Sequence, residues 1–408
     1  MLPATVQAQV TIEECWQKAQ QNYPLVRRYD LIEKTKAYNL DNAAKGYLPQ
    51  FSLSGKVSYQ SDVTKIPVKV PGVTIEELSK DQYQVVAEMR QNIWDGGAVR
   101  MQKRQAEAEA AMERERQNVD MYALNSRVND LFFGILLLDE QLQQNVLLQQ
   151  ELERNHRTIS AYVANGIAHQ ADLDAVAVEQ LNARQKQAEL SFARDAYLRM
   201  LSMLTGEELA AGTRLQKPQP EPAPSSLADI RRPELEWFDA QSAALTVQEQ
   251  ALNVRHTPRF GLFVQGAYGN PGLDMLKNDF VPYYMAGVRM SWNFGSLYTL
   301  KNDRRKIGTQ RKQLEVERDV FLFDTRLLMT QQERAVRAME VQMKDDDEIV
   351  RLRTNIRRAA ETKVANGTLT VAEMLRELTN ENMARLAKAL HEIQHLQQIY
   401  QMKYMANQ

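Results

Sequence analysis

The chain has 408 residues, of which 44% are hydrophobic and 25% are charged, and these proportions exclude a disordered or collagen-like chain. Lys+Arg number 51 against 52 for Asp+Glu, so the net charge of -1 gives no electrostatic reason to expect a nucleic-acid partner. The single cysteine, Cys15, excludes an internal disulfide and a cysteine-based metal centre. The mean hydropathy is -0.50, and the lack of an apolar run of about 18 residues excludes a transmembrane helix. It does not exclude short transmembrane strands.

The first ten residues resemble the end of an export signal. Val6-Gln7-Ala8 fits the small-x-small rule for signal cleavage, but neither a charged segment nor an apolar run precedes it. We expect residues 1–10 to be either the remnant of an export signal or an ordinary flexible start.

A helix and then a pair of strands are expected next. Two stretches between about residues 49 and 94 alternate between apolar and polar side chains, as strands with one apolar face do. That face holds Phe51, Leu53, Val57, Tyr59, Tyr83, Val85, Ala87, Met89 and Ile93. Alternation alone favours a soluble sandwich. Strands of about 10 residues with aromatic side chains near their ends favour a membrane barrel instead.

A long helical hairpin is expected over residues 97–205. From Gly97 to about Tyr162 there is no proline, and Gly134 is the only other glycine, so one helix of roughly 90–100 Å is expected. The Asn-Gly pair at Asn165 can reverse the chain between antiparallel helices. The apolar run 131–138 predicts a buried segment where several helices converge.

The pattern then repeats after a proline-rich linker, residues 206–233, which cannot be helical throughout. A helix, a strand pair at about 258–293 and a helical hairpin at about 296–406 follow. Three markers recur in the same order: Leu-Pro or Thr-Pro opens each strand pair, Ile-Trp-Asp-Gly-Gly or Ser-Trp-Asn-Phe-Gly closes it, and Val-Ala-Asn-Gly recurs letter for letter at each helical turn. We therefore expect two repeats, residues 11–205 and 234–408, with a coiled-coil seam in the last helix.

The sequence contains one motif of a catalytic type. His391-Glu392-Ile393-Gln394-His395 matches the H-E-x-x-H pattern of zinc proteases. The 13 residues after His395 contain no third ligand, and Ile393 falls in the coiled-coil seam, so we predict no metal site. Because phosphate-binding, nucleophile and dinucleotide motifs are also missing, we predict neither an enzyme nor a cofactor. The acidic run Asp345-Asp346-Asp347-Glu348 is interpreted as a solvated helical face.

These features together resemble the TolC-type outer-membrane efflux protein family, the channels of tripartite efflux and type I secretion systems. The resemblance runs from Thr11 to about Tyr404. It is most specific at Gly46-Tyr47-Leu48-Pro49 and at Trp94-Asp95-Gly96-Gly97. It implies an α+β membrane protein: a trimeric 12-stranded β-barrel with four strands per chain, continued by a long α-helical coiled-coil periplasmic tunnel, internally duplicated.

The resemblance also implies a set of residues at the hairpin tips. In the family, each tip carries a glycine and then an acid six residues further on, and the tips close the channel and contact an adaptor. Gly166 with Asp172 and Gly367 with Glu373 match this pattern. Arg376 stands where some members have another acid, so their gating network is not expected to be complete here.

Physical arguments independent of the family also favour an oligomer. Four strands cannot close into a barrel, and open sheet edges are not tolerated in lipid. Eight strands from a dimer leave an interior filled by side chains, whereas twelve strands from a trimer leave an aqueous bore. The polar faces of the strands, which hold Lys56, Glu88, Arg90 and Arg289, are expected to line that lumen.

We therefore predict a passive export channel in the cell outer membrane that extends into the periplasm. Its predicted partners are two further copies of the chain, a periplasmic adaptor (membrane fusion) protein, an inner-membrane transporter that supplies the energy, and outer-membrane lipid. The alternative is a soluble periplasmic coiled-coil adaptor or scaffold protein, which the duplicated strand pairs disfavour. Drug, metal, siderophore and protein cargo are left open.

Overall fold

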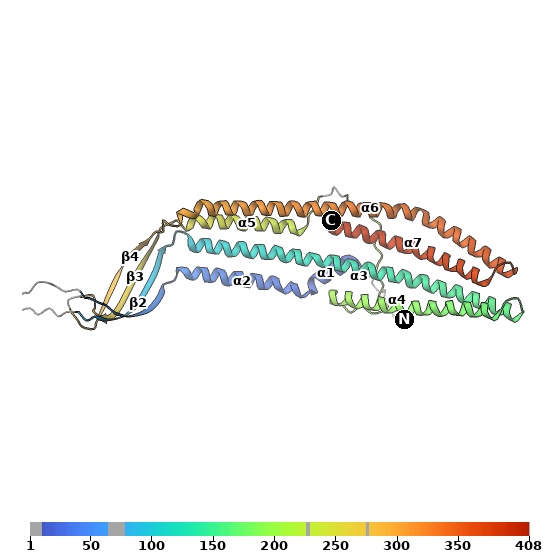
Figure 1. Cartoon of the computed structure of the whole chain (residues 1–408), viewed down its shortest axis with the longest axis horizontal. Coiled ribbons are helices and arrows are strands. Elements are labelled where there is room, and N and C mark those ends of the chain that lie inside the picture. The colour runs from blue at the N-terminus through green and yellow to red at the C-terminus, as the bar shows by residue number, and fades with distance from the viewer. Residues whose placement is uncertain (1–9, 64–77, 226–228, 275–276, 408) are drawn as a thin grey trace, which may run out of the picture. The chain divides into compact units, whose positions relative to one another are not determined.

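The computed structural model describes residues 10–63, 78–225, 229–274 and 277–407. Figure 1 shows the elements in chain order. They are α1 (Ile12–Asn22), η1 (Pro24–Val26), α2 (Arg27–Ala44), η2 (Lys45–Tyr47), β1 (Gln50–Tyr59), β2 (Asp81–Trp94), α3 (Ala98–Ala164), α4 (Gln170–Thr205), α5 (Pro233–Val254), β3 (Arg259–Asn270), β4 (Val281–Ser291), α6 (Leu297–Ala365) and α7 (Val371–Ala406). The order of a strand pair followed by a helical hairpin therefore occurs twice. Residues 1–9 of the expected signal remnant lie outside the described residues.

The chain forms two compact units that do not coincide with the repeats. The first unit contains residues 1–28, 116–236 and 318–408. The second contains residues 29–115 and 237–317. Each unit takes segments from both repeats because α3 and α6, with 67 and 69 residues, contribute to both units.

In the second unit, the four strands form one antiparallel sheet in the order β1-β2-β3-β4. Because opposed residues of antiparallel strands share a face, the register separates two faces. The apolar face contains Leu53, Val57, Tyr83, Val85, Val264, Tyr268, Tyr284 and Val288, and the polar face contains Lys56, Ser58, Gln84, Glu88, Arg90, Arg259, Gln265 and Arg289. The two-faced strands predicted from alternation are therefore confirmed.

The alternation on β2 breaks near its end. Strict alternation placed Ile93 on the apolar face, but the register shifts between Asn92 and Trp94. Trp94 is therefore opposite Phe260, and their ring centroids are 5.9 Å apart. A β-bulge adds one residue to one strand and reverses the alternation beyond it.

The core of the first unit lies where four helices meet. Leu131, Phe132, Phe133, Ile135 and Leu136 of α3 are buried there, as the apolar run predicted. They pack against α1, α4 and α7, which contribute Ile12, Cys15, Leu198, Leu201, Ile393, Leu396 and Tyr400. Fully burying a Leu, Ile or Phe side chain stabilises by about 1.5–3 kcal/mol, so this cluster is a principal source of stability for the unit.

The linker between the repeats has no helix over residues 216–225. Ion pairs connect it to α7: Lys217 lies 2.7 Å from Glu392, and Glu221 pairs with Lys403. At the start of α5, the Arg232 guanidinium lies 5.1 Å and 4.8 Å from the ring centroids of Tyr122 and Tyr404.

Among the described residues, none of the helices has a stretch both long enough and apolar enough to cross a membrane.

Candidate functional site

Two sets of residues were predicted to be functional, the hairpin tips and the polar face of the sheet. The tips belong to the first compact unit and the sheet to the second, so each is described by itself.

At the tips, a glycine ends each outgoing helix. Gly166 and Gly367 both have φ of 70°, the left-handed conformation that a Cβ disfavours. Each glycine N–H donates to a carbonyl three residues earlier, at 3.0 Å in both loops. The shared Val-Ala-Asn-Gly sequence thus produces the same helix end in both repeats.

The acid that follows each glycine belongs to the start of the returning helix. The Asp172 carboxylate accepts a hydrogen bond from the His169 backbone N–H at 3.0 Å. The Glu373 carboxylate accepts from the Thr370 N–H at 3.0 Å, and the Thr370 hydroxyl oxygen accepts from the Glu373 N–H at 3.2 Å. This reciprocal pair is a capping box, which satisfies donors that the first helical turn leaves unpaired.

The Glu373 side chain is also exposed to solvent. The Thr370 backbone N–H and hydroxyl hold the pKa of Glu373 below its ordinary value, so the carboxylate is charged at neutral pH. Arg376 pairs with Glu377 at 3.8 Å rather than with Glu373. The charge of Glu373 is thus exposed to solvent, in addition to its capping role.

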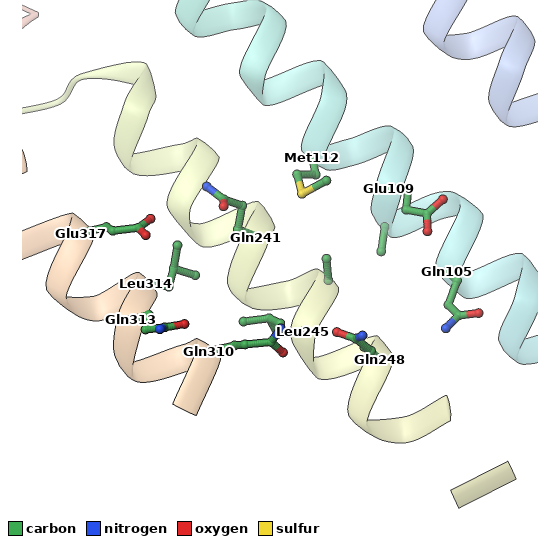
Figure 2. Close-up of a pocket in the computed structure, with 12 residues that line it drawn as sticks. Gln105, Glu109, Met112, Gln241, Leu245, Gln248, Gln310, Gln313, Leu314 and Glu317 are labelled. Carbon is green, nitrogen blue, oxygen red and sulfur yellow. The ribbon is translucent and has the colours of Figure 1, made fainter. Parts of the chain in front are cut away.

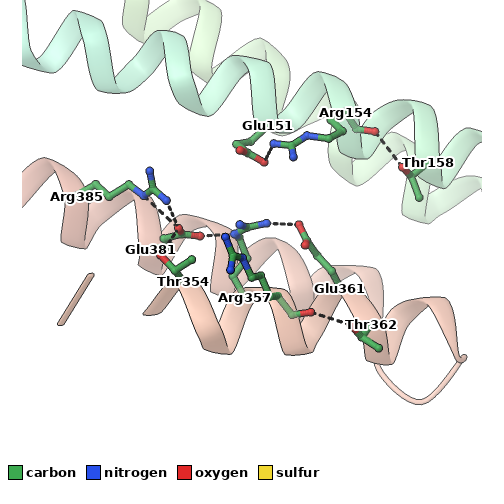
Figure 3. Close-up of polar contacts among 10 residues, drawn as sticks. Glu151, Arg154, Thr158, Thr354, Arg357, Glu361, Thr362, Glu381 and Arg385 are labelled. Atoms are coloured by element: carbon green, nitrogen blue, oxygen red, sulfur yellow. Dashed lines mark hydrogen bonds and ion pairs between the residues drawn. The ribbon is translucent and has the colours of Figure 1, made fainter. Parts of the chain in front are cut away.

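A buried ionic network near the second tip was missed by the sequence analysis (Figure 3). Glu381 on α7 and Arg357 on α6 are only 3% and 7% exposed, and they form an ion pair. Glu381 also accepts from the Thr354 hydroxyl at 2.7 Å and from Arg385 at 2.5 Å, and Arg357 also pairs with Glu361. Glu381 lies three residues after the buried Leu378, a spacing that puts both side chains on the same face of α7. This spacing was the signal in the sequence that could have indicated the burial of Glu381.

The pKa values show that this network is charged. Burial raises the pKa of Glu381, but hydrogen bonds from Thr354, Arg385 and Arg357 outweigh burial and leave the pKa below its ordinary value. Burial likewise opposes the charged form of Arg357, yet its contacts with Glu381 and Glu361 raise its pKa.

The H-E-x-x-H histidines contact acids of α6. His391 Nδ1 lies 2.9 Å from Asp346 Oδ2, and His395 Nε2 lies 3.6 Å from Glu340 Oε1. Asp346 is 7% exposed. The interpretation of the acidic run as a wholly solvated face is therefore wrong at this residue, because α7 covers it.

The polar face of the sheet brings together Glu88, Arg90 and Arg289 from β2 and β4. Glu88 accepts from Arg90 Nε at 2.6 Å and Nη2 at 2.7 Å, and Arg289 Nη1 lies 3.6 Å from its carboxylate. Lys56 lies on the same face of β1, opposite Gln84. The register thus places all four predicted lumen residues on one face.

The second unit also contains a polar groove between α3, α5 and α6, with a volume of about 400 Å³ (Figure 2). Five glutamines line it, namely Gln105, Gln241, Gln248, Gln310 and Gln313. Amide side chains of this kind can donate and accept hydrogen bonds, but they do not supply an acid–base or nucleophilic pair.

Solved structures of outer-membrane channels have the same fold. CusC, from a study of folding and transmembrane channel formation, matches with a TM-score of 0.68 at 13% identity over 97% of this chain and 91% of that chain. The CmeC outer membrane channel of Campylobacter jejuni matches with 0.64 at 12% identity, covering 97% and 85%. The open MtrE outer membrane channel of Neisseria gonorrhoeae matches with 0.63 at 13% identity, covering 97% and 88%. The chain thus has the fold of an outer-membrane channel protein.

Residues 15–207 match the family described as "Outer membrane efflux protein". No curated protein matches. The family match covers the first repeat and the channel fold covers nearly the whole length, so the chain resembles the outer membrane efflux protein family. The family match over the first repeat and the fold together support a passive channel of the outer membrane that extends into the periplasm.

Proposed function

We propose that three copies of the chain assemble edge to edge into one efflux channel. The observation that carries this proposal is the sheet itself, because β1 and β4 each have one edge that no described strand pairs. An unpaired strand edge cannot remain in lipid, so each β1 edge pairs with the β4 edge of the next copy. Twelve strands then enclose an aqueous bore.

The two faces of the sheet fix its orientation in this assembly. Phe51, Leu53 and Val57 are 75–78% exposed in the single chain, and Tyr284 and Val288 are 81% and 71% exposed. Such a continuous exposed apolar surface needs a cover, which lipid provides on the outside of a barrel. The polar face, with Glu88 and the two arginines, then lines the lumen.

The proposed partners follow from this assembly. The hairpin tips form the periplasmic aperture, with Gly166, Asp172, Gly367, Glu373 and Arg376 at the entrance or in contact with an adaptor protein. Glu373 is repeated three times there and forms a ring of negative charge that favours cations. An inner-membrane transporter supplies the energy and delivers the cargo through the adaptor.

Edge-to-edge assembly is tested by cysteine cross-linking in a Cys15→Ser background. Pairs of cysteines scanned along β1 and β4 are expected to cross-link chains into dimers and trimers, and native mass measurement in detergent should give three chains. A control pair at Glu88 and Gln265, which are opposite each other on β2 and β3, should cross-link only within one chain. A stable monomer with no β1–β4 cross-link would refute the assembly.

The aperture is tested separately by single-channel recording of Glu373→Gln. We expect weaker cation preference and weaker block by multivalent cations added on the tunnel side. If ion selectivity is unchanged and only thermal stability falls, by the 0.3–1 kcal/mol or so that a charge at a helix start contributes, Glu373 has a capping role alone.

A further inference from the structure

The charges on the polar face of the sheet are unbalanced. The four strands carry Lys56, Arg90, Arg259 and Arg289 on this face against one acid, Glu88. The only other charged strand residue, Asp81, is on the apolar face at the start of β2, opposite Tyr59. Each chain therefore presents four cations and one anion on its polar face.

The single acid is covered by the arginines that it binds. The side chain of Glu88 is 12% exposed, whereas those of Arg90 and Arg289 are 58% and 52% exposed. The Arg289 guanidinium lies 4.9 Å from the ring centroid of Phe263, a neighbour on the same face. Solvent near this surface thus meets guanidinium groups rather than the carboxylate, so the field there attracts anions.

A cavity of about 230 Å³ adjoins this face at the sheet end where β1 ends and β2 begins. The polar side chains that line it are Lys56, Ser58, Gln82, Tyr83, Gln84, Asn270 and Tyr283. Among the described lining residues there is one cation and no carboxylate. A cavity with this lining suits an anion better than a cation.

Several donors at this cavity have no acceptor within the described part of the chain. Lys56 forms no ion pair or hydrogen bond there, and the Ser58 hydroxyl oxygen is buried without a partner. The Tyr283 hydroxyl oxygen accepts from the Gln84 amide, which leaves its own proton to donate. An ammonium and two hydroxyls are the donor set that a carboxylate or phosphate oxygen accepts from.

We propose that this cavity, the Lys56 pocket, binds the oxyanion of a small anionic solute as it passes through the lumen. The inference rests on the proposed channel, because only that assembly turns the polar face towards the bore. The exposed arginines of the same face raise the local concentration of anions, and the Lys56 pocket holds one at a defined place. Carboxylates and phosphates share the chemistry that the pocket recognises.

The proposal is tested with inorganic pyrophosphate as the probe, in single-channel recordings of the full-length channel. Block should occur in bilayers of neutral lipid and should not change when anionic lipid is added, which separates a solute site from a lipid headgroup site. Lys56→Gln is expected to weaken block about tenfold through loss of a close charge. Lys56→Arg should retain block, and Glu88→Gln should strengthen it by removing the only acid of the face.

Lys186→Gln serves as the matched control, since it removes an exposed lysine of α4 outside the sheet. Equal pyrophosphate block in the wild type, Lys56→Gln and Lys186→Gln channels would overturn the Lys56 pocket while leaving the channel intact. The absence of any conducting oligomer would instead overturn the proposed function. Block that appears only with anionic lipid would also overturn the pocket as a solute site.

Discussion

The buried network of Glu381 makes a prediction about local stability. Glu381→Gln removes the charge that pairs with Arg357 and Arg385, and Arg357 is 7% exposed, so water cannot replace the lost partner. Removing one partner of a buried ion pair costs about 3–5 kcal/mol. Because Glu361 still pairs with Arg357, we expect the loss of local stability to be at the lower end of this range, about 3 kcal/mol.

Hydrogen exchange measured by mass spectrometry is the suitable assay because it reports local opening rather than unfolding of a whole assembly. A loss of about 3 kcal/mol corresponds to roughly a hundredfold faster exchange in peptides covering residues 354–385. Glu348→Gln breaks the exposed pair with Arg351 and should change exchange little, since exposed pairs contribute about 0–1 kcal/mol. Replacing both Arg357 and Glu381 with leucine should recover most of the protection.

The same network predicts a dependence on pH. The pKa of Glu381 is lower in the folded chain than its unfolded value of about 4.3. The stabilisation that the charged Glu381 contributes is therefore fully present above the unfolded pKa, and it is lost as the pH falls through the lower folded pKa. The protection of wild-type peptides 354–385, measured as exchange relative to the intrinsic rate at the same pH, should fall below about pH 4. The reasoning is refuted if Glu381→Gln exchanges like the wild type, or no faster than Glu348→Gln.

Two further predictions concern the sheet and the tips. Val85→Arg puts a charge on the lipid face and should reduce the yield of folded trimer, at a cost of about 2–4 kcal/mol. Ser54→Arg, on the polar face, should reduce that yield only slightly. An equal loss of trimer in both variants would contradict the assignment of faces. Gly367→Ala forces a Cβ onto a φ of 70° and should lower the thermal stability by about 1–2 kcal/mol. Gly308→Ala, inside α6 with open space around it, should instead raise thermal stability by about 0.5–1 kcal/mol, and the same sign for both glycines would contradict the role of φ.

Much of the fold could be predicted because its signals are periodic and local. Alternation at Leu53, Val85 and Val288 defined the apolar face, and long stretches without proline defined α3 and α6. The β-bulge at Ile93 escaped prediction because one inserted residue leaves no local mark in the sequence.

The candidate sites were predicted less completely. The glycine-to-acid spacing located the tips, but only the structure showed that Asp172 and Glu373 bond to the backbone of their helix starts. Asp346 was interpreted as a surface acid and Glu381 was not singled out, since their burial depends on partners 45 and 24 residues away in the chain. The role of the tip acids at an aperture remains a prediction.

The unpaired edges of β1 and β4 have a genetic consequence. A proline in β1 or β4 prevents that edge strand from pairing. The other edge of the same chain can still pair with a normal neighbour, and the ring then fails to close. When normal and edge-defective chains are made in equal amounts and mix freely, only about one in eight threefold rings contains normal chains alone. Edge-strand alleles should therefore be dominant over the normal gene, whereas alleles that prevent the chain from folding at all should be recessive.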